Sequence, residues 1–279
     1  MYKTLSGREV SDALLINIKR RVEKLERKPM LGIVLVGSDP ASQVYVNMKV
    51  KKAATAGVKT QLHRLPESIK EEELLKLVDH LNKDKEVDGF IVQAPLPGHI
   101  DGTKIIEAIK TEKDVDGWTS ANMGAIFLNA KNKDIFVPAT PAGVMCILEY
   151  YSVPIEGKHA VVVGRSNVVG KPLAMLLLSK NATVTICHSK TPDISKYTKE
   201  ADIVVAAAGV PQMIKGSMIK KGAYVIDVGT TKVGHKVVGD VLFDEVIKKA
   251  HCSPVPGGVG PMTVAMLINN TLEAAERRK

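Results

Sequence analysis

Short apolar strand patterns alternate with amphipathic helix patterns along most of this chain of 279 residues. In the first half, strand patterns at residues 31–36, 59–65 and 87–92 are separated by helix patterns at 41–57 and 69–82. A helix between consecutive strands is typical of a parallel sheet whose two faces are covered by helices. We therefore predict an α/β fold.

The same rhythm restarts in the second half, and the chain is long enough for two domains at roughly 100–200 residues each. The strands predicted there cover residues 160–163, 182–187, 201–208 and 223–228. The remaining helices are predicted at residues 6–27, 138–151, 171–180 and 262–278. Pro29 ends the first of these helices, and Gly57 caps the helix at 41–57.

The chain carries 39 Lys and Arg against 30 Asp and Glu, a formal net charge of +9. One interpretation is nucleic-acid binding, and the other is a solvated lysine surface with a local site for an anion. Aromatic residues make up only 4% of the chain, which leaves few platforms on which bases stack. The sequence has no basic repeat and no zinc-finger spacing, so we favour the solvated surface and expect no nucleic-acid partner.

Neither a membrane span nor a disulfide framework is expected. The longest apolar runs, such as residues 203–210, fall well short of the roughly 18 residues that cross a bilayer, and no apolar leader follows the N-terminus. Cys146, Cys187 and Cys252 are odd in number and show no CxxC spacing. This usage favours the reducing cytoplasm and argues against disulfides and against a bound metal.

A glycine-containing turn follows the strand predicted at 160–163. The segment 164–172 reads GRSNVVGKP, so Gly164 permits a tight turn and Gly170 permits close approach of the backbone at the start of a helix. Free N–H groups at a helix N-terminus bind phosphate, which makes this strand–turn–helix a candidate dinucleotide site. Ser166 stands where the usual GxGxxG motif has its second glycine.

The end of the next strand indicates which dinucleotide would bind. An acidic residue commonly holds the ribose 2′-hydroxyl of NAD at this position. Here the strand is followed by His188, Ser189 and Lys190, with no carboxylate at the tip. Together with Arg165 these groups suit a 2′-phosphate, so we predict NADP rather than NAD. The competing interpretation is an ordinary basic loop.

Polar side chains of the first half stand where a ligand would bind, although each has a simpler interpretation. Tyr45 and Lys49 are four residues apart on one predicted helix, where most lysines are solvated. Gln93 follows a predicted strand, and ligands of open α/β sheets bind outside the carboxyl ends of strands. Asp114 and Asp116 occur in a segment where aspartates commonly form turns.

Six motifs occur in an order that is typical of one family. The two most specific are GRSxxVGxP at residues 164–172 and PVPGGVGPMT at residues 254–263. The shorter ones are SxxYVxxK, VQxPLP, KDVDG and PATP, at residues 42–49, 92–97, 113–117 and 138–141. With these motifs the chain resembles, over nearly its whole length, the bifunctional methylenetetrahydrofolate dehydrogenase/methenyltetrahydrofolate cyclohydrolase family.

The resemblance implies an enzyme of one-carbon metabolism with two activities. It would oxidise 5,10-methylenetetrahydrofolate to 5,10-methenyltetrahydrofolate with NADP and hydrolyse the product to 10-formyltetrahydrofolate. It also implies an N-terminal α/β folate domain at residues 1–138, completed by 259–279, and a Rossmann-type doubly wound domain at 139–258. The active site would lie in the cleft between them, and two copies would form a homodimer through the Rossmann domain.

The resemblance further assigns roles to individual residues. Lys49 would be the catalytic lysine of the hydrolysis, with Gln93 hydrogen-bonded to it. Tyr45 would pack on the aminobenzoate ring of the folate, and Asp116 would bind its pterin. The substrate would also contact the loop of Pro256, Gly257, Gly258 and Val259. The cofactor would contact Gly164, Arg165, Ser166, Val169, Gly170, His188, Ser189, Lys190 and Thr230.

Two departures from the family pattern are present. Relatives commonly have Gly-Ile-Asn where this chain has Gly229-Thr230-Thr231, close to the cofactor, which keeps NAD as an alternative to NADP. Ser253 stands where relatives usually carry threonine, and it retains the hydroxyl. A dehydrogenase without cyclohydrolase activity and a non-catalytic NADP-binding protein are the other hypotheses. The presence of Lys49 together with Gln93 argues against both.

Overall fold

The computed structural model describes residues 2–130, 135–234 and 236–278. The chain forms two compact units, one from residues 13–139 with 264–279 and the other from residues 1–12 with 140–263. Both are built on parallel sheets with helices, so the predicted α/β class is confirmed. Residues 1–12, which the sequence hypothesis assigned to the N-terminal domain, group in the structure with residues 140–263.

The unit containing residues 13–139 has a three-stranded parallel sheet in the order β2-β1-β3. Its strands are β1 (Met30–Val36), β2 (Lys59–Leu65) and β3 (Gly89–Val92). Successive side chains of a strand point to opposite sides of the sheet. Because nearly all side chains of the central strand β1 are buried, both of its faces are covered. Leu31, Ile33 and Leu35 join one core cluster with residues of the C-terminal helix, whereas Val34 and Val36 join a second cluster with residues of α3 (Glu71–Lys83).

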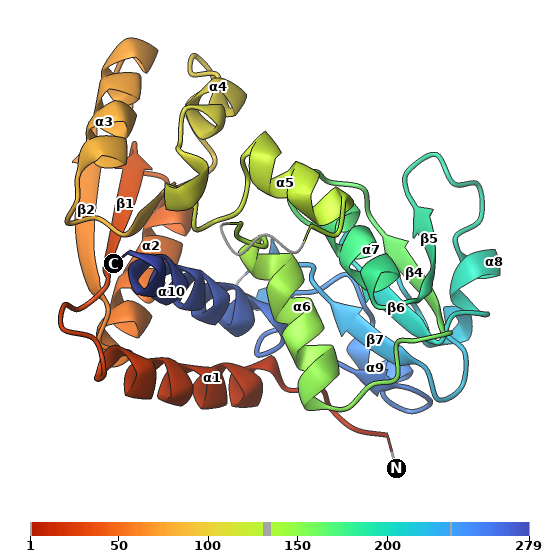
Figure 1. Ribbon diagram of the computed structural model, residues 1–279. Coiled ribbons are helices and arrows are strands. Elements are labelled where there is room, and N and C mark those ends of the chain that lie inside the picture. The colour runs from red at the N-terminus through yellow and green to blue at the C-terminus, as the bar shows by residue number, and fades with distance from the viewer. Residues whose placement is uncertain (1, 131–134, 235, 279) are drawn as a thin grey trace. The chain divides into compact units, whose positions relative to one another are not determined.

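Helices cover this sheet largely where the periodicity predicts them (Figure 1). The helix α2 (Pro40–Thr55) begins where the carboxylate of Asp39 accepts the N–H of Ser42 at 2.7 Å. The helix α1 (Gly7–Val22) is shorter than predicted, because the N–H groups of Lys24 and Leu25 donate to carbonyls three residues back and end it in turns. The short helices α4 (Gly102–Glu107), η1 (Thr111–Lys113) and α5 (Ser120–Phe127) lack a long apolar stripe and were not predicted.

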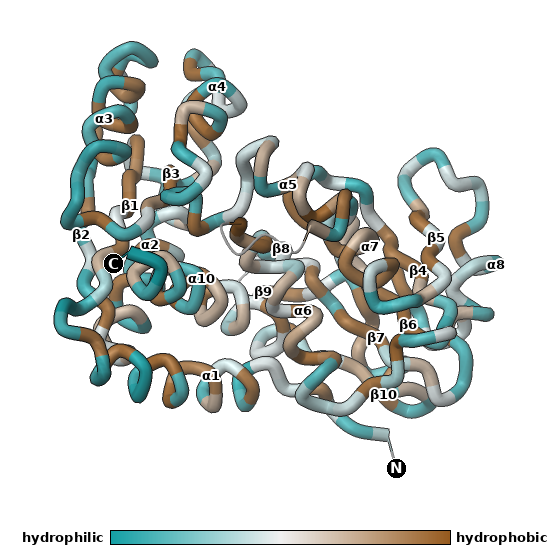
Figure 2. Tube along the Cα trace, in the orientation of Figure 1, coloured by the Kyte–Doolittle hydropathy of each residue, from teal (hydrophilic) through white to brown (hydrophobic). Residues whose placement is uncertain are grey.

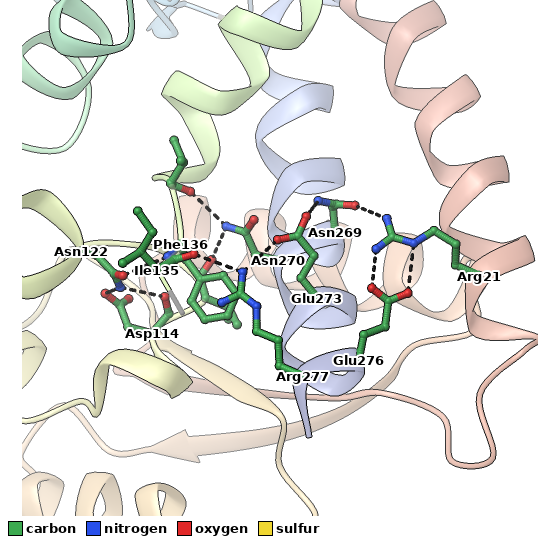
Figure 3. A network of polar contacts seen from close by, with 12 residues as sticks. Arg21, Asp114, Asn122, Ile135, Phe136, Asn269, Asn270, Glu273, Glu276 and Arg277 are labelled. Atoms are coloured by element: carbon green, nitrogen blue, oxygen red, sulfur yellow. Dashed lines mark hydrogen bonds and ion pairs between the residues drawn. The ribbon is translucent and has the colours of Figure 1, made fainter. Parts of the chain in front are cut away.

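The C-terminal helix α10 (Val259–Arg277) contacts the chain segments on both sides of α5. The side-chain amide of Asn270 donates to the carbonyls of Val115 at 2.9 Å and Val137 at 3.0 Å. The guanidinium of Arg277 lies over the ring of Phe136, and Figure 3 shows it beside these contacts. The apolar stripe predicted for this helix is confirmed, because Val264, Leu267, Ile268 and Leu272 are all buried.

The other unit contains a five-stranded parallel sheet in the order β10-β7-β6-β4-β5. Its strands are β4 (His159–Val163), β5 (Thr183–Cys187), β6 (Ile203–Ala206), β7 (Tyr224–Asp227) and β10 (His251–Cys252). The chain passes from β4 to β5 on one side and then to β6 on the other side of β4, which is the doubly wound arrangement. The apolar strands β6 and β7 are drawn largely brown in Figure 2, and their valines and isoleucines are buried.

The remaining elements of this unit surround that sheet. They are the helices α6 (Ala139–Tyr150), α7 (Gly170–Ser179), α8 (Ser195–Thr198) and α9 (Phe243–Val246), the 3-10 turn η2 (Gly216–Met218), and the antiparallel strands β8 (Thr231–Val233) and β9 (Lys236–Val238). The sequence pattern predicted α6 and α7 and missed the shorter elements. No helix in the described part of the chain is long and apolar enough to cross a membrane.

Replacing Asn270 with alanine tests the attachment of α10. Two buried carbonyl groups would lose their hydrogen-bond donors, so we expect the free energy of unfolding to fall by about 2 kcal/mol in urea titrations. The matched control is Asn47→Ala on the exposed face of α2, which we expect to change it by less than about 0.5 kcal/mol. Equal effects of the two substitutions would contradict the attachment.

Candidate functional site

Lys49 is a buried lysine whose amine has one defined side-chain partner. It lies on α2 with only 8% of its surface exposed, and its Nζ donates to Oε1 of Gln93 at 2.9 Å. Gln93 directly follows β3, and its backbone N–H donates to the carbonyl of Val34 at 2.8 Å. The amide NH2 of Gln93 donates to the carbonyl of Ala94 at 2.7 Å, so the amide oxygen is left to face the lysine. The simpler interpretation of Lys49 as a solvated lysine is therefore excluded.

A carboxyl group interacts electrostatically with this amine. Burial lowers the pKa of Lys49, and the charge of Asp116 acts in the opposite direction. Burial likewise raises the pKa of Asp116, and the charge of Lys49 opposes that shift. Both shifts favour the uncharged forms, and perturbed titratable pairs of this kind are typical of functional sites.

The two aspartates of the KDVDG motif have different roles. Asp114 is buried, and its carboxylate accepts the backbone N–H groups of Gly117 at 2.9 Å and Thr119 at 2.7 Å. It also accepts the side-chain amide of Asn122 at 2.8 Å, as Figure 3 shows. It therefore forms the turn, as an aspartate in such a segment commonly does. Asp116 lies next to this rigid turn and is the aspartate that interacts with Lys49.

Tyr45 supplies an accessible ring one helical turn before Lys49. Residues four apart lie on the same face of a helix, and the side chain of Tyr45 is 41% exposed. An exposed aromatic ring beside a buried amine suits a ligand that has both a flat ring and a polar group.

The two glycines of the turn after β4 stand where the packing leaves no room for a side chain. Gly164 has a φ of +137°, and a Cβ there would lie 2.2 Å from the carbonyl oxygen of Ala207. A Cβ on Gly170 would lie 2.3 Å from the carbonyl oxygen of Gly164. Ser166, which replaces the usual second glycine, accepts the N–H of Gly170 on its hydroxyl at 3.2 Å. The serine thus stabilises the start of α7, and Val169 is the residue that precedes this helix.

The other predicted cofactor residues follow the carboxyl ends of neighbouring strands. Val163 pairs with Cys187 on β5 and with Ala206 on β6, so the loops that follow these three strands leave the sheet at the same edge. Arg165, Ser189 and Lys190 are exposed there, and no carboxylate stands at the tip of β5.

His188 and Thr230 lie in the loops that follow β5 and β7. The backbone N–H of His188 donates to the hydroxyl of Thr191 at 2.9 Å, and its Nδ1 accepts the N–H of Lys190 at 3.1 Å. Thr230 is exposed. A tight glycine turn, a helix N-terminus and exposed basic groups at one sheet edge fit a phosphorylated dinucleotide.

The glycine-rich loop at residues 254–259 is fixed at both ends. The hydroxyl of Ser253 accepts the N–H of Asp227 at 2.7 Å, and the carbonyl of Gly257 accepts the N–H of Arg8 at 2.9 Å. A Cβ on Gly258 would lie 2.4 Å from the carbonyl oxygen of Pro254, so this close turn requires glycine. Relatives usually carry threonine in place of Ser253, and the hydroxyl that the serine retains makes this structural hydrogen bond. Pro256 at the tip of the loop is exposed.

Sequence reasoning missed two buried carboxylates of the same unit, Asp227 and Asp240. Asp227 ends β7, and burial, with the charge of Asp240, raises its pKa to about 6 against the hydrogen bonds that it accepts. The available signal was a charged residue directly after a run of apolar strand residues. Among the described residues, no group of three His, Cys, Asp or Glu side chains is arranged to hold a metal ion.

Comparison with known proteins identifies models of one family on both halves of the chain. The model of the tetrahydrofolate dehydrogenase/cyclohydrolase catalytic domain matches residues 5–116, and that of the NAD(P)-binding domain matches residues 138–279. The bifunctional protein FolD of Moorella thermoacetica is 51% identical over 278 residues, which cover 98% of each chain.

Solved structures of relatives share the whole fold. The bifunctional FolD dehydrogenase/cyclohydrolase of Campylobacter jejuni has a TM-score of 0.98 at 43% identity and covers 100% of both chains. The Trypanosoma brucei dehydrogenase-cyclohydrolase, solved with NADP and an inhibitor, has a TM-score of 0.94 at 41% identity and covers 99% of this chain and 98% of its own. The chain therefore belongs to the tetrahydrofolate dehydrogenase/cyclohydrolase family.

Proposed function

We propose that the protein oxidises 5,10-methylenetetrahydrofolate to 5,10-methenyltetrahydrofolate with NADP and then hydrolyses the product to 10-formyltetrahydrofolate. The observation that carries this function is the buried amine of Lys49, hydrogen-bonded to Gln93 and interacting with Asp116. Family membership and the glycine turn at Gly164 add the dinucleotide half of the reaction.

The oxidation requires little acid–base catalysis by the protein. Bound NADP would supply the hydride acceptor for the one-carbon bridge of the folate, whose neighbouring nitrogen lone pair would stabilise the resulting cation. The protein must therefore hold the two molecules in a productive orientation. Arg165, Ser166, Ser189 and Lys190 would hold the cofactor, supported by the tight turn of Gly164. Tyr45 would pack on the aminobenzoate ring, and Asp116 would bind the pterin.

The hydrolysis needs proton transfer, for which Lys49 is suited. A buried lysine with a lowered pKa has a larger neutral fraction at neutral pH than a solvated one, so it both accepts and returns a proton more readily. Gln93 fixes the position of the amine, and the charge of Asp116 prevents its pKa from falling further. Pro256, Gly257, Gly258 and Val259 would contact the folate through their backbone.

The choice of NADP rests on the edge of the sheet that follows β5. Arg165, Ser189 and Lys190 are exposed there, and these groups suit a 2′-phosphate better than a 2′-hydroxyl. The net charge of +9 would also favour the approach of NADP and of a folate, both of which are anions.

A dehydrogenase without cyclohydrolase activity is the second candidate. It would leave unexplained why Lys49 is buried against Gln93, because the burial of an amine costs stability and hydrolysis is the activity that would need it. A binding protein without catalysis would leave the same cost unexplained.

We also propose a homodimer through the unit that holds the five-stranded sheet, in the cytoplasm. The hairpin of β8 and β9 exposes Val233 and Val237, which a second copy would cover. The odd number of cysteines, Cys146, Cys187 and Cys252, without CxxC spacing supports a reducing compartment.

Replacing Lys49 with alanine tests the hydrolytic role. We expect hydrolysis of methenyltetrahydrofolate above the spontaneous rate to fall by at least about 100-fold, because the proton-transferring group is lost. Hydride transfer to NADP, which needs no general base, should fall much less. The control is Lys51→Ala on the exposed face of the same helix, which should leave both rates unchanged. Unchanged hydrolysis in the Lys49 variant would remove the lysine from this role.

Replacing Arg165 with alanine tests the recognition of the 2′-phosphate. We expect the Kd of NADP, measured by isothermal titration calorimetry, to rise about tenfold and that of NAD to rise much less, because only NADP carries the phosphate. The control is Lys180→Ala, which removes one exposed positive charge just after the C-terminal end of α7. Equal weakening of NADP and NAD by Arg165→Ala would mean that the arginine does not bind this phosphate.

A further inference from the structure

Two buried carboxylates link the loops at the carboxyl edge of the five-stranded sheet. One oxygen of Asp240 accepts the consecutive N–H groups of Ala208 at 2.6 Å and Gly209 at 2.9 Å, directly after β6. Asp227 accepts the N–H groups of Gly229, after β7, at 3.0 Å and of Asp240 and Val241 at 2.9 Å. Through these five hydrogen bonds the two carboxylates hold the backbone after β6, the backbone after β7 and the segment at residues 240–241.

Two glycines make room for these carboxylates in a reciprocal way. A Cβ on Gly229, two residues after Asp227, would lie 2.3 Å from Oδ1 of Asp240. A Cβ on Gly239, directly before Asp240, would lie 1.9 Å from Oδ2 of Asp227. Each carboxylate thus occupies the space beside the glycine that accompanies the other, and neither glycine accepts a side chain.

The second oxygen of Asp240 is not used by the fold. Its Oδ1 is buried and has no hydrogen-bond partner among the described residues. A carboxylate that served only to satisfy two N–H groups would carry an unnecessary buried acceptor, and buried polar atoms without partners are rare in native proteins. This cost points to a role of Asp240 beyond stability.

The loops that the pair holds are those that form the proposed dinucleotide site. The carbonyl of Ala207, next to Ala208, packs against Gly164 in the turn that precedes Arg165 and Ser166. Gly229, which Asp227 holds, is followed directly by Thr230. A displacement of either loop would therefore be transmitted to residues that contact the cofactor.

We propose that Asp240 and Asp227 are positioning residues for NADP: they fix the loops after β6 and β7 so that the turn at Gly164 keeps the shape that the dinucleotide requires. They act through the backbone and do not contact the cofactor. The inference rests on the proposed function, since it assumes that this edge of the sheet binds NADP.

The test compares Asp240→Ala and Asp240→Asn with a matched control, Asp202→Ala. Asp202 also accepts a backbone N–H, that of His159 at 3.1 Å, but it directly precedes β6 and so stands at the opposite end of the strand. Three measurements are made on each purified full-length variant: the Kd of NADP by calorimetry, hydrolysis of methenyltetrahydrofolate without cofactor, and amide hydrogen exchange of the peptide around residues 206–210.

We expect Asp240→Ala to raise the Kd of NADP about tenfold, because two charge-assisted hydrogen bonds to the loop are lost. Amide exchange at residues 208 and 209 should accelerate, and hydrolysis, which depends on Lys49 in the other unit, should stay within about twofold of the wild type. Asp240→Asn, which keeps an acceptor oxygen without the charge, should raise the Kd about threefold and so rescue part of the loss. Asp202→Ala should leave the Kd unchanged.

Two results would overturn the proposal. One is an unchanged Kd in the asparagine variant together with unchanged exchange at residues 208 and 209, which decides the matter even where the alanine variant does not fold. The other is an equal rise of the Kd in the Asp202 control. The wild type is titrated first, because a wild type that does not bind NADP would refute the proposed function and leave the link between the loops to be judged from hydrogen exchange alone.

Discussion

The three-stranded and the five-stranded sheet of this protein are both parallel, and parallel pairing brings the carboxyl ends of neighbouring strands to one edge. The register of Val163 with Cys187 and Ala206 makes three loops leave the larger sheet side by side. In the smaller sheet the same geometry places Gln93 just beyond β3, where its backbone N–H still pairs with β1 through Val34. Gln93 and the loops of the proposed dinucleotide site therefore follow strand ends, which supports the precise positioning of reactants, whereas Tyr45 and Lys49 are held by the helix α2.

In the unit that contains the three-stranded sheet, one aspartate of the KDVDG motif stabilises the fold and the other is available for chemistry. Asp114 forms a turn, because its carboxylate accepts hydrogen bonds from three N–H groups. Asp116, two residues on, is held by the turn that Asp114 builds and is left to interact with Lys49. A single short motif thus supplies both the support and the functional group. Exchanging the two roles would leave the buried N–H groups of Gly117 and Thr119 without an acceptor.

Sequence patterns predicted the fold where burial is periodic and failed where it is not. The strand predicted at residues 59–65 is β2, although its residues are mostly half-buried, and the apolar stripe of α10 is buried as expected from its helical spacing. The helix α5 and the β8–β9 pair carry no such alternation and were missed. The motifs identified the family, which is confirmed, yet the helix pattern gave no sign that Lys49 is buried, because its burial depends on packing against a residue 44 positions away.

The same limit explains why the pair of Asp227 and Asp240 escaped sequence reasoning. Asp227 ends β7 two residues before Gly229, and Asp240 directly follows Gly239, and an aspartate near a glycine at a loop is usually explained by a turn. Only the structure shows that the carboxylate of Asp240 fills the space beside Gly229 and that the carboxylate of Asp227 fills the space beside Gly239. The sequence at residues 227–240 therefore encodes a contact between two loops that no local pattern describes. The buried Oδ1 of Asp240 has no hydrogen-bond partner in the described part of the chain, and a role of this aspartate in holding the cofactor edge would account for that cost.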